Sequence, residues 1–182
     1  MSLYMFEFVP AQADRSGVDN LLARVDKAAA AAGGELIESQ VTRNHERVFT
    51  VVEAASRDAL RAAFDPADFV EASEVSGPDE VRLVGAELDQ VKAARPAAGY
   101  LVEWDFPPDL DMDTYLARKK ANAPKYAEVP EVRFLRTYVR EDMAKCVCLY
   151  DAPDEQVVRR ARDVVNTPVD RLHPLERQGD PR

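Results

Sequence analysis

The sequence predicts an α+β fold built from two tandem ferredoxin-like domains, each with the order βαββαβ. Two observations support this prediction. The same succession of strand-like and helix-like patterns occurs twice along the chain. Residues 4–8 (YMFEF) also resemble residues 100–104 (YLVEW), and residues 53–60 resemble residues 150–157 at nearly the same spacing. Long-period similarity of this kind is typical of a tandem domain.

The first half contains one complete βαββαβ pattern. Its predicted elements are a strand at 3–9, a helix at 16–32, strands at 35–42 and 47–53, a helix at 56–64 and a closing strand at 80–84. Ser16 with Asp19 three residues later resembles a capping box and predicts the start of the first helix. Gly33 and Gly34 predict its end, because glycine stops helices.

The second half repeats the order. Its predicted elements are a strand at 100–105, a helix from 112 to about 124, strands at 132–139 and 145–150, a helix at 154–165 and a closing strand at 170–175. Pro124 must end or kink the first of these helices, because proline lacks the backbone donor. The predicted domains are therefore 1–85 and 99–175, with a linker at 86–98 and a disordered tail at 176–182.

Composition limits the classes of function. The chain has 182 residues and a formal net charge of −9, and 46% of its residues are hydrophobic. An acidic chain without a Lys/Arg-rich run predicts no binding to nucleic acid or to an anionic membrane. It has no apolar stretch long enough to span a bilayer and no signal-like N-terminus, so we expect a cytoplasmic protein. The oligomeric state is left open between a monomer and a homodimer.

Alternation along the strands predicts which side chains lie on the sheet face that the helices leave open. Tyr100, Val102 and Trp104 are expected to face the helices, and Glu103 to lie on the open face. In the strand at 145–150, we expect Val147 and Leu149 to lie in the core. Cys146, Cys148 and Tyr150 are then expected on the open face. If the open faces of the two domains meet, the ligand-binding residues predicted between the sheets are Glu7, Glu103, Arg136, Tyr138, Cys148 and Tyr150. The alternative is that Arg136 only neutralises Glu103.

Several segments of the second half resemble a family of small ferredoxin-like proteins that includes a nickel-binding protein. They are residues 100–104 (YLVEW), 136–139 (RTYV), 145–153 (KCVCLYDAP) and 167–172 (TPVDRL). The resemblance covers about residues 99–175, and it implies that the two halves form a dimeric α+β barrel within one polypeptide.

The resemblance also implies residue roles. Glu103, Cys148 and Tyr150 fill the family's glutamate, cysteine and tyrosine positions, whereas Arg136 and Ala161 stand where the family usually or often has histidine. An arginine is always charged and cannot replace a neutral imidazole as a ligand. We therefore expect that the family's nickel site is not retained and assign no metal-binding residue.

Two classes of function follow from the sequence. The first is a binding protein that holds a small molecule, with a metal ion among the candidates, between the two sheets. The alternative is a small cofactor-independent enzyme, an oxygenase or isomerase of the kind that other α+β barrels host. The sequence contains no phosphate-binding glycine loop and no Ser/His/Asp set, so it assigns neither a cofactor nor a catalytic residue.

Overall fold

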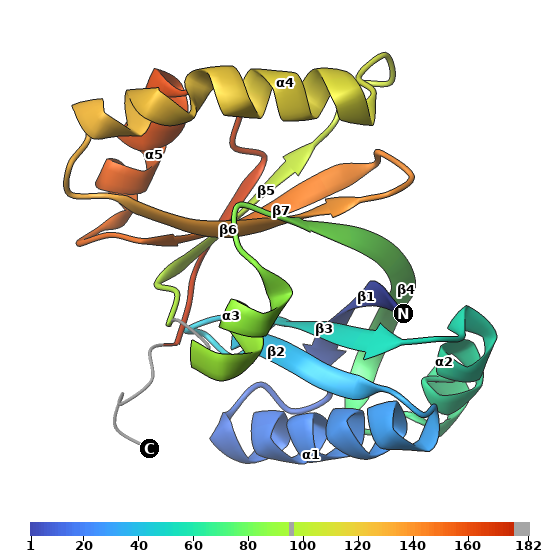
Figure 1. Ribbon diagram of the computed structural model, residues 1–182. Coiled ribbons are helices and arrows are strands. Elements are labelled where there is room, and N and C mark those ends of the chain that lie inside the picture. The colour runs from blue at the N-terminus through green and yellow to red at the C-terminus, as the bar shows by residue number, and fades with distance from the viewer. Residues whose placement is uncertain (95–96, 177–182) are drawn as a thin grey trace. The chain divides into compact units, whose positions relative to one another are not determined.

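The computed structural model describes residues 1–94 and 97–176 (Figure 1). These residues form two compact units. The first contains residues 1–81 and 88–94, and the second contains residues 82–87 and 97–176. Except for Glu176, the tail predicted at 176–182 lies outside the described residues.

The first unit is a four-stranded antiparallel sheet with helices packed on it. Its elements are β1 (Ser2–Pro10), α1 (Arg15–Ala31), β2 (Glu35–Val41), β3 (Val48–Ala54), α2 (Arg57–Ala63), η1 (Pro66–Asp68), β4 (Ala72–Val84) and α3 (Leu88–Ala94). The strand order is β2-β3-β1-β4, which is that of a ferredoxin-like split βαβ unit. Phe6 and Phe8 point from β1 into a core that includes Phe64 and Phe69.

The predicted start of the first helix is wrong by two residues. Asp14 is the N-cap of α1, and its Oδ1 accepts a hydrogen bond of 2.8 Å from the backbone N–H of Gly17. Ser16 is already inside the helix. Aspartate and serine cap helices about equally well, so the capping-box pattern alone could not choose between them.

Two further elements differ from the prediction. Strand β4 begins at Ala72 rather than at residue 80, and it pairs with β1 from Leu3↔Val81 to Pro10↔Ala72. A register shift opposite Met5 and Glu7 breaks the alternation that sequence patterns depend on. The segment predicted as a linker at 86–98 contains helix α3, whose Lys92 Nζ donates to Glu53 Oε2 at 2.6 Å.

The second unit repeats the arrangement. Its elements are the last residues of β4, then β5 (Tyr100–Asp105), α4 (Met112–Asn122), η2 (Ala123–Glu128), β6 (Arg133–Arg140), β7 (Lys145–Asp151), α5 (Glu155–Val164) and β8 (Arg171–Pro174). Strands β5 to β8 have the order β6-β7-β5-β8, again that of a split βαβ unit. Helices α4 and α5 cover one face of this sheet (Figure 1). The α+β class is therefore confirmed. The prediction for Pro124 is confirmed too, because α4 ends at Asn122 and a 3-10 turn follows.

The register of β5 and β7 corrects the predicted facing of three residues. Val102 pairs with Cys148, and Tyr100 pairs with Tyr150. Directly paired residues lie on the same face of a sheet, so Cys148 and Tyr150 share the helix-covered face with Val102. The same pairing puts Cys146 opposite Trp104 on that face, and all of these residues belong to the core beneath α5. Their predicted position on the open face is wrong.

Among the described residues, none of the helices has the length and apolar character needed to cross a membrane.

Candidate functional site

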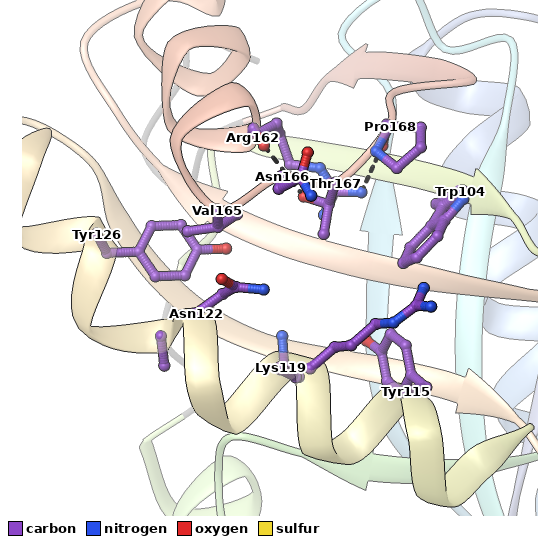
Figure 2. Close-up of a pocket in the computed structure, with 12 residues that line it drawn as sticks. Trp104, Tyr115, Lys119, Asn122, Tyr126, Arg162, Val165, Asn166, Thr167 and Pro168 are labelled. Carbon is purple, nitrogen blue, oxygen red and sulfur yellow. Dashed lines mark hydrogen bonds between the residues drawn. The ribbon is translucent and has the colours of Figure 1, made fainter. Parts of the chain in front are cut away.

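A pocket of about 500 Å³ lies on the helix-covered side of the second unit. Its lining comes from β5, from α4 and η2, and from the end of α5 with the loop that follows it (Figure 2). The lining residues are Trp104, Tyr115, Arg118, Lys119, Asn122, Ala123, Tyr126, Arg162, Val165, Asn166, Thr167 and Pro168. The pocket is therefore built by one unit alone.

Local sequence shapes the wall at the end of α5. Asn166 adopts a left-handed backbone with φ of 58°, a conformation that asparagine tolerates better than most residues. The turn lets the backbone N–H of Thr167 donate to Arg162 O at 2.9 Å, which satisfies a carbonyl in the last turn of the helix. As a result, Thr167 and Pro168 fold back beside Arg162 and face the pocket (Figure 2).

The pocket is positively charged and aromatic. Arg118, Lys119 and Arg162 contribute cationic groups, and none of the described lining residues has a carboxylate. Trp104 and Tyr115 lie at one end and Tyr126 lies at the other (Figure 2). In a chain with a net charge of −9, a carboxylate-free lining with three cations is a local reversal of sign.

Arg162 connects the pocket to the buried strand β7. Its Nη1 donates to Tyr150 Oη at 3.1 Å and to Cys148 Sγ at 3.4 Å, and its Nη2 donates to Pro168 O at 2.6 Å. Burial disfavours the charge of Arg162, but the neighbouring Tyr150 and Cys148 outweigh it and hold the pKa above its ordinary value. The guanidinium is therefore a fixed positive charge in the floor of the pocket.

Two thiols lie beside this arginine. Cys146 and Cys148 are free and buried, and their sulfur atoms are 3.8 Å apart. Thr137 Oγ1 lies 3.0 Å from Cys148 Sγ. Burial raises the pKa of Cys146 well above its ordinary value. The hydrogen bond from Cys146 and the charges of Arg162 and Lys119 lower the pKa of Cys148. The pair thus favours ionisation of one thiol, Cys148.

The tyrosines of this region remain protonated at neutral pH. Burial raises the pKa of Tyr150 to about 12 and raises the pKa values of Tyr115 and Tyr126 above the ordinary value. Tyr126 Oη and Tyr150 Oη are 2.8 Å apart. A protonated phenol has one O–H and two lone pairs, so Tyr126 Oη can still accept a hydrogen bond at the pocket while it is bonded to Tyr150.

Glu103 lies in a separate ionic network. Its carboxylate accepts hydrogen bonds from Lys145 Nζ at 2.6 Å and from Arg171 Nε at 2.8 Å, and it lies 2.8 Å from His173 Nε2. Burial opposes its ionisation, but the hydrogen bonds from His173, Arg171 and Lys145 outweigh burial and hold the pKa of Glu103 well below its usual range. Arg171 is also bound by Asp105. These partners neutralise Glu103, so its burial needs no ligand.

The structure divides the six residues that the sequence predicts as a site. Glu7 belongs to the first unit. In the second unit, Glu103, Arg136 and Tyr138 share one sheet face, because Glu103 and Tyr138 both pair with Val147 and Arg136 pairs with Leu149. Cys148 and Tyr150 lie on the opposite, helix-covered face. A role for Glu7, Arg136 or Tyr138 in binding a ligand stays a prediction.

Sequence reasoning missed the residues that line the pocket. Arg162 had a visible signal, because it follows Val158 by four positions and therefore lies on the apolar side of α5. A charged residue in an apolar helical stripe needs a partner in the core. Lys119 and Tyr126 had no comparable signal, because they follow the common pattern of a surface helix and a turn.

The residues present do not fit the nickel site that the family resemblance implies. Arg136 and Ala161 are both buried and neither can donate a neutral nitrogen to a metal. In the part of the chain that the structure describes, no group of three or more His, Cys, Asp or Glu side chains is placed to hold a metal ion.

Comparison with known families supports a relationship for the second unit. Residues 100–175 match the family described as nickel-responsive, SCO4226-like proteins. The crystal structure of SCO4226 from Streptomyces coelicolor A3(2) aligns with 42% of this chain and 94% of its own, at 16% identity and a TM-score of 0.37. The family match by itself shows that residues 100–175 resemble a nickel-responsive family. A search of the curated proteins finds no significant match.

Two solved structures align over almost the whole chain. One is the protein TA0507, described as a proposed chlorite dismutase; the alignment covers 97% of this chain and 95% of that one, with 16% identity and a TM-score of 0.55. The other is a proposed monooxygenase from Lactobacillus acidophilus NCFM, with 97% and 93% coverage, 12% identity and a TM-score of 0.55. At identities of 16% and 12%, these alignments show a similar fold and carry no activity over to this chain.

Proposed function

We propose that the protein binds a small molecule with an anionic group and an apolar or aromatic body, and that the pocket of the second unit is its site. The observation that carries this proposal is the lining, which combines three cations with three aromatic rings and contains no carboxylate among its described residues. An anion gains from such surroundings, and it gains most beside Arg162, whose charge is desolvated.

The shape and chemistry of the pocket support the same proposal. Its volume of about 500 Å³ is in the usual range for small-molecule sites. Trp104 and Tyr115 offer ring faces and edges at one end, where a planar apolar group can stack. Asn122, Asn166 and Thr167 add neutral polar groups that can orient the ligand.

We also propose that the two units pair as an intramolecular pseudo-dimer. The support is that the two solved structures with TM-scores of 0.55 align along 97% of the chain, and so along both halves. Each half has the strand order of a complete split βαβ unit, as a fused dimer requires. Under this proposal the described pocket lies within the second half of the pseudo-dimer.

A second candidate function is an enzyme that acts on the bound molecule without a cofactor. The observation that favours it is the hydrogen-bond chain from Tyr126 through Tyr150 and Arg162 to Cys148, which can hold a proton or a negative charge next to a bound molecule. The similar structure described as a proposed monooxygenase supports the fold and not the reaction. Oxygen consumption or product formation from a ligand that binds the pocket would favour this candidate.

Native mass spectrometry of the purified protein tests the binding proposal. We expect an additional mass that is released on denaturation and identified as an anion. The double variant Arg162→Met with Lys119→Met should lose this mass. Arg159→Gln is the matched control, because Arg159 is exposed on the same helix and pairs with Glu155. A cationic ligand, or one retained by the double variant, would contradict the proposal.

A further inference from the structure

Arg162 is a buried charge whose partners include no carboxylate. Arg162 is 2% exposed to solvent. Within residues 97–176, its hydrogen-bond partners are Cys148, Tyr150 and the carbonyl oxygen of Pro168, and its buried Nε has no partner. Arginine does not lose its proton in proteins. A buried charge without a counter-ion is strongly destabilising, so a negative group is expected beside Arg162.

Cys148 is the partner best suited to supply that negative charge. A thiol ionises at an ordinary pKa near 8.5, and a tyrosine only near 10. Burial raises the pKa of Tyr150 to about 12, which excludes a phenolate there at neutral pH. Arg162 Nη1 lies 3.4 Å from Cys148 Sγ, and Thr137 and Cys146 contact the same sulfur.

The groups that face Cys148 are neutral or positive at neutral pH. They are Cys146 and Tyr150 from β7, Thr137 from β6, Tyr115 and Lys119 from α4, Tyr126 from η2 and Arg162 from α5. None of these groups is a carboxylate, so nothing in this set opposes a negative sulfur electrostatically.

We propose that Cys148 is a thiolate in the native protein at neutral pH, with Arg162 as its counter-ion, and that an anion bound in the pocket competes with this thiolate for Arg162. The second part rests on the proposed function. The first part does not. The pair gives the pocket an internal anion in the absence of ligand, which satisfies the buried guanidinium.

The competition has a defined sign. An anion beside Arg162 weakens the stabilisation of the thiolate, so it raises the pKa of Cys148. By linkage, protonation of Cys148 must strengthen anion binding by the same factor. The pocket is therefore expected to bind anions more tightly as the pH falls through the pKa of Cys148.

The ultraviolet absorbance of thiolates, followed against pH in the folded protein, tests the ion pair. The wild-type protein should show a thiolate step with a midpoint below the ordinary thiol value of about 8.5. Cys148→Ser should lose this step, and the matched variant Cys146→Ser should keep it. Arg162→Met should raise the midpoint by about 1–3 pH units, the effect expected for removal of an adjacent opposite charge. Arg162→Gln, which also removes the charge, should raise the midpoint in the same way and replaces the methionine variant if that variant does not fold.

A wild-type midpoint at or above the ordinary thiol value would overturn the ion pair, and so would a low step that survives in Cys148→Ser. Repeating the titration with saturating benzoate tests the competition. A raised midpoint supports it, and an unchanged midpoint with benzoate bound overturns it. If benzoate binds neither the wild-type protein nor Cys148→Ser, that result counts against the proposed function and also overturns the competition. The ion pair is judged separately, by the titration without benzoate.

Discussion

The hydroxyl groups of Tyr126 and Tyr150 lie 2.8 Å apart and form a hydrogen bond between the wall of the pocket and strand β7. Tyr150 is fully buried, and its oxygen also accepts a hydrogen bond from Arg162 Nη1. The two tyrosines thus fix the position of the guanidinium. Because Tyr126 is itself a lining residue, the shape of the pocket and the position of its buried charge depend on the same pair.

Variants of these tyrosines should show this dependence in stability. Tyr126→Phe removes one neutral hydrogen bond and should lower the free energy of unfolding by about 1 kcal/mol. Tyr150→Phe also removes the bond to charged Arg162 and should cost about 2–3 kcal/mol. Urea denaturation measures both. The double variant should cost less than the sum, because both single changes break the same bond, and strict additivity would contradict this coupling.

Glu103 should make stability depend on pH. Its pKa is lowered in the folded state, so its stabilising contribution is present above the ordinary value of 4.5 and is lost as the pH falls below that value. Glu103→Gln should cost about 3 kcal/mol at neutral pH, because it removes the buried negative charge that binds Lys145 and Arg171, and the loss should shrink in acid. Denaturation curves at several pH values measure this. Glu155→Gln, at an exposed pair, should show neither effect, and an equal cost for Glu103→Gln at every pH would contradict the assignment.

The cap of helix α1 can be tested by a matched pair of alanine variants. Asp14→Ala should lower the free energy of unfolding by about 1 kcal/mol, because it removes the acceptor for the N–H of Gly17. Ser16→Ala should change it by less than about 0.5 kcal/mol, because Ser16 lies inside the helix. A larger loss for Ser16→Ala than for Asp14→Ala in thermal or urea denaturation would show that the sequence-based assignment was right.

Calorimetric titration with nickel should show no tight, stoichiometric binding to the metal-free wild-type protein. The reason is that Arg136 and Ala161 stand at the positions where the resemblance implies histidine, and neither is a ligand. The variant that combines Arg136→His with Ala161→His should not restore tight binding either, because Arg136 and Ala161 lie on opposite sides of the sheet and the two imidazoles cannot reach one ion. Tight binding by the wild-type protein would contradict the prediction.

The fold was more predictable from the sequence than the site was. Apolar periodicity and the internal similarity are properties of whole strands and helices, so they predicted the element order even where a bound such as Ala72 was missed. Alternation gives the two faces of a strand but does not say which face is the core. For β7, both Val147 and Cys148 are buried, so only the pairing of Cys148 with Val102 could decide.

The pocket could not be predicted for a related reason. Its lining joins Trp104, Lys119 and Arg162, which are far apart in the sequence and follow different local patterns. Trp104 and Lys119 are ordinary in their own segments, and only Arg162, a charge on the apolar side of α5, differs from its local pattern. The cations come together only because α4 and α5 pack on the same sheet. The pattern of residues within each segment does not predict that packing.

Fluorescence of Trp104 offers the most direct test of the proposed binding function. Trp104 is the only tryptophan in the chain and it lines the pocket, so its emission reports on this site alone. Benzoate should change the emission in a saturable way, and benzamide, which has the same ring without the charge, should bind at least about tenfold more weakly. Arg162→Met combined with Lys119→Met should abolish the preference for benzoate, and Arg159→Gln should keep it. Equal binding of benzoate and benzamide by the wild-type protein, or a full preference for benzoate in this double variant, would contradict the assignment of this pocket to an anionic ligand.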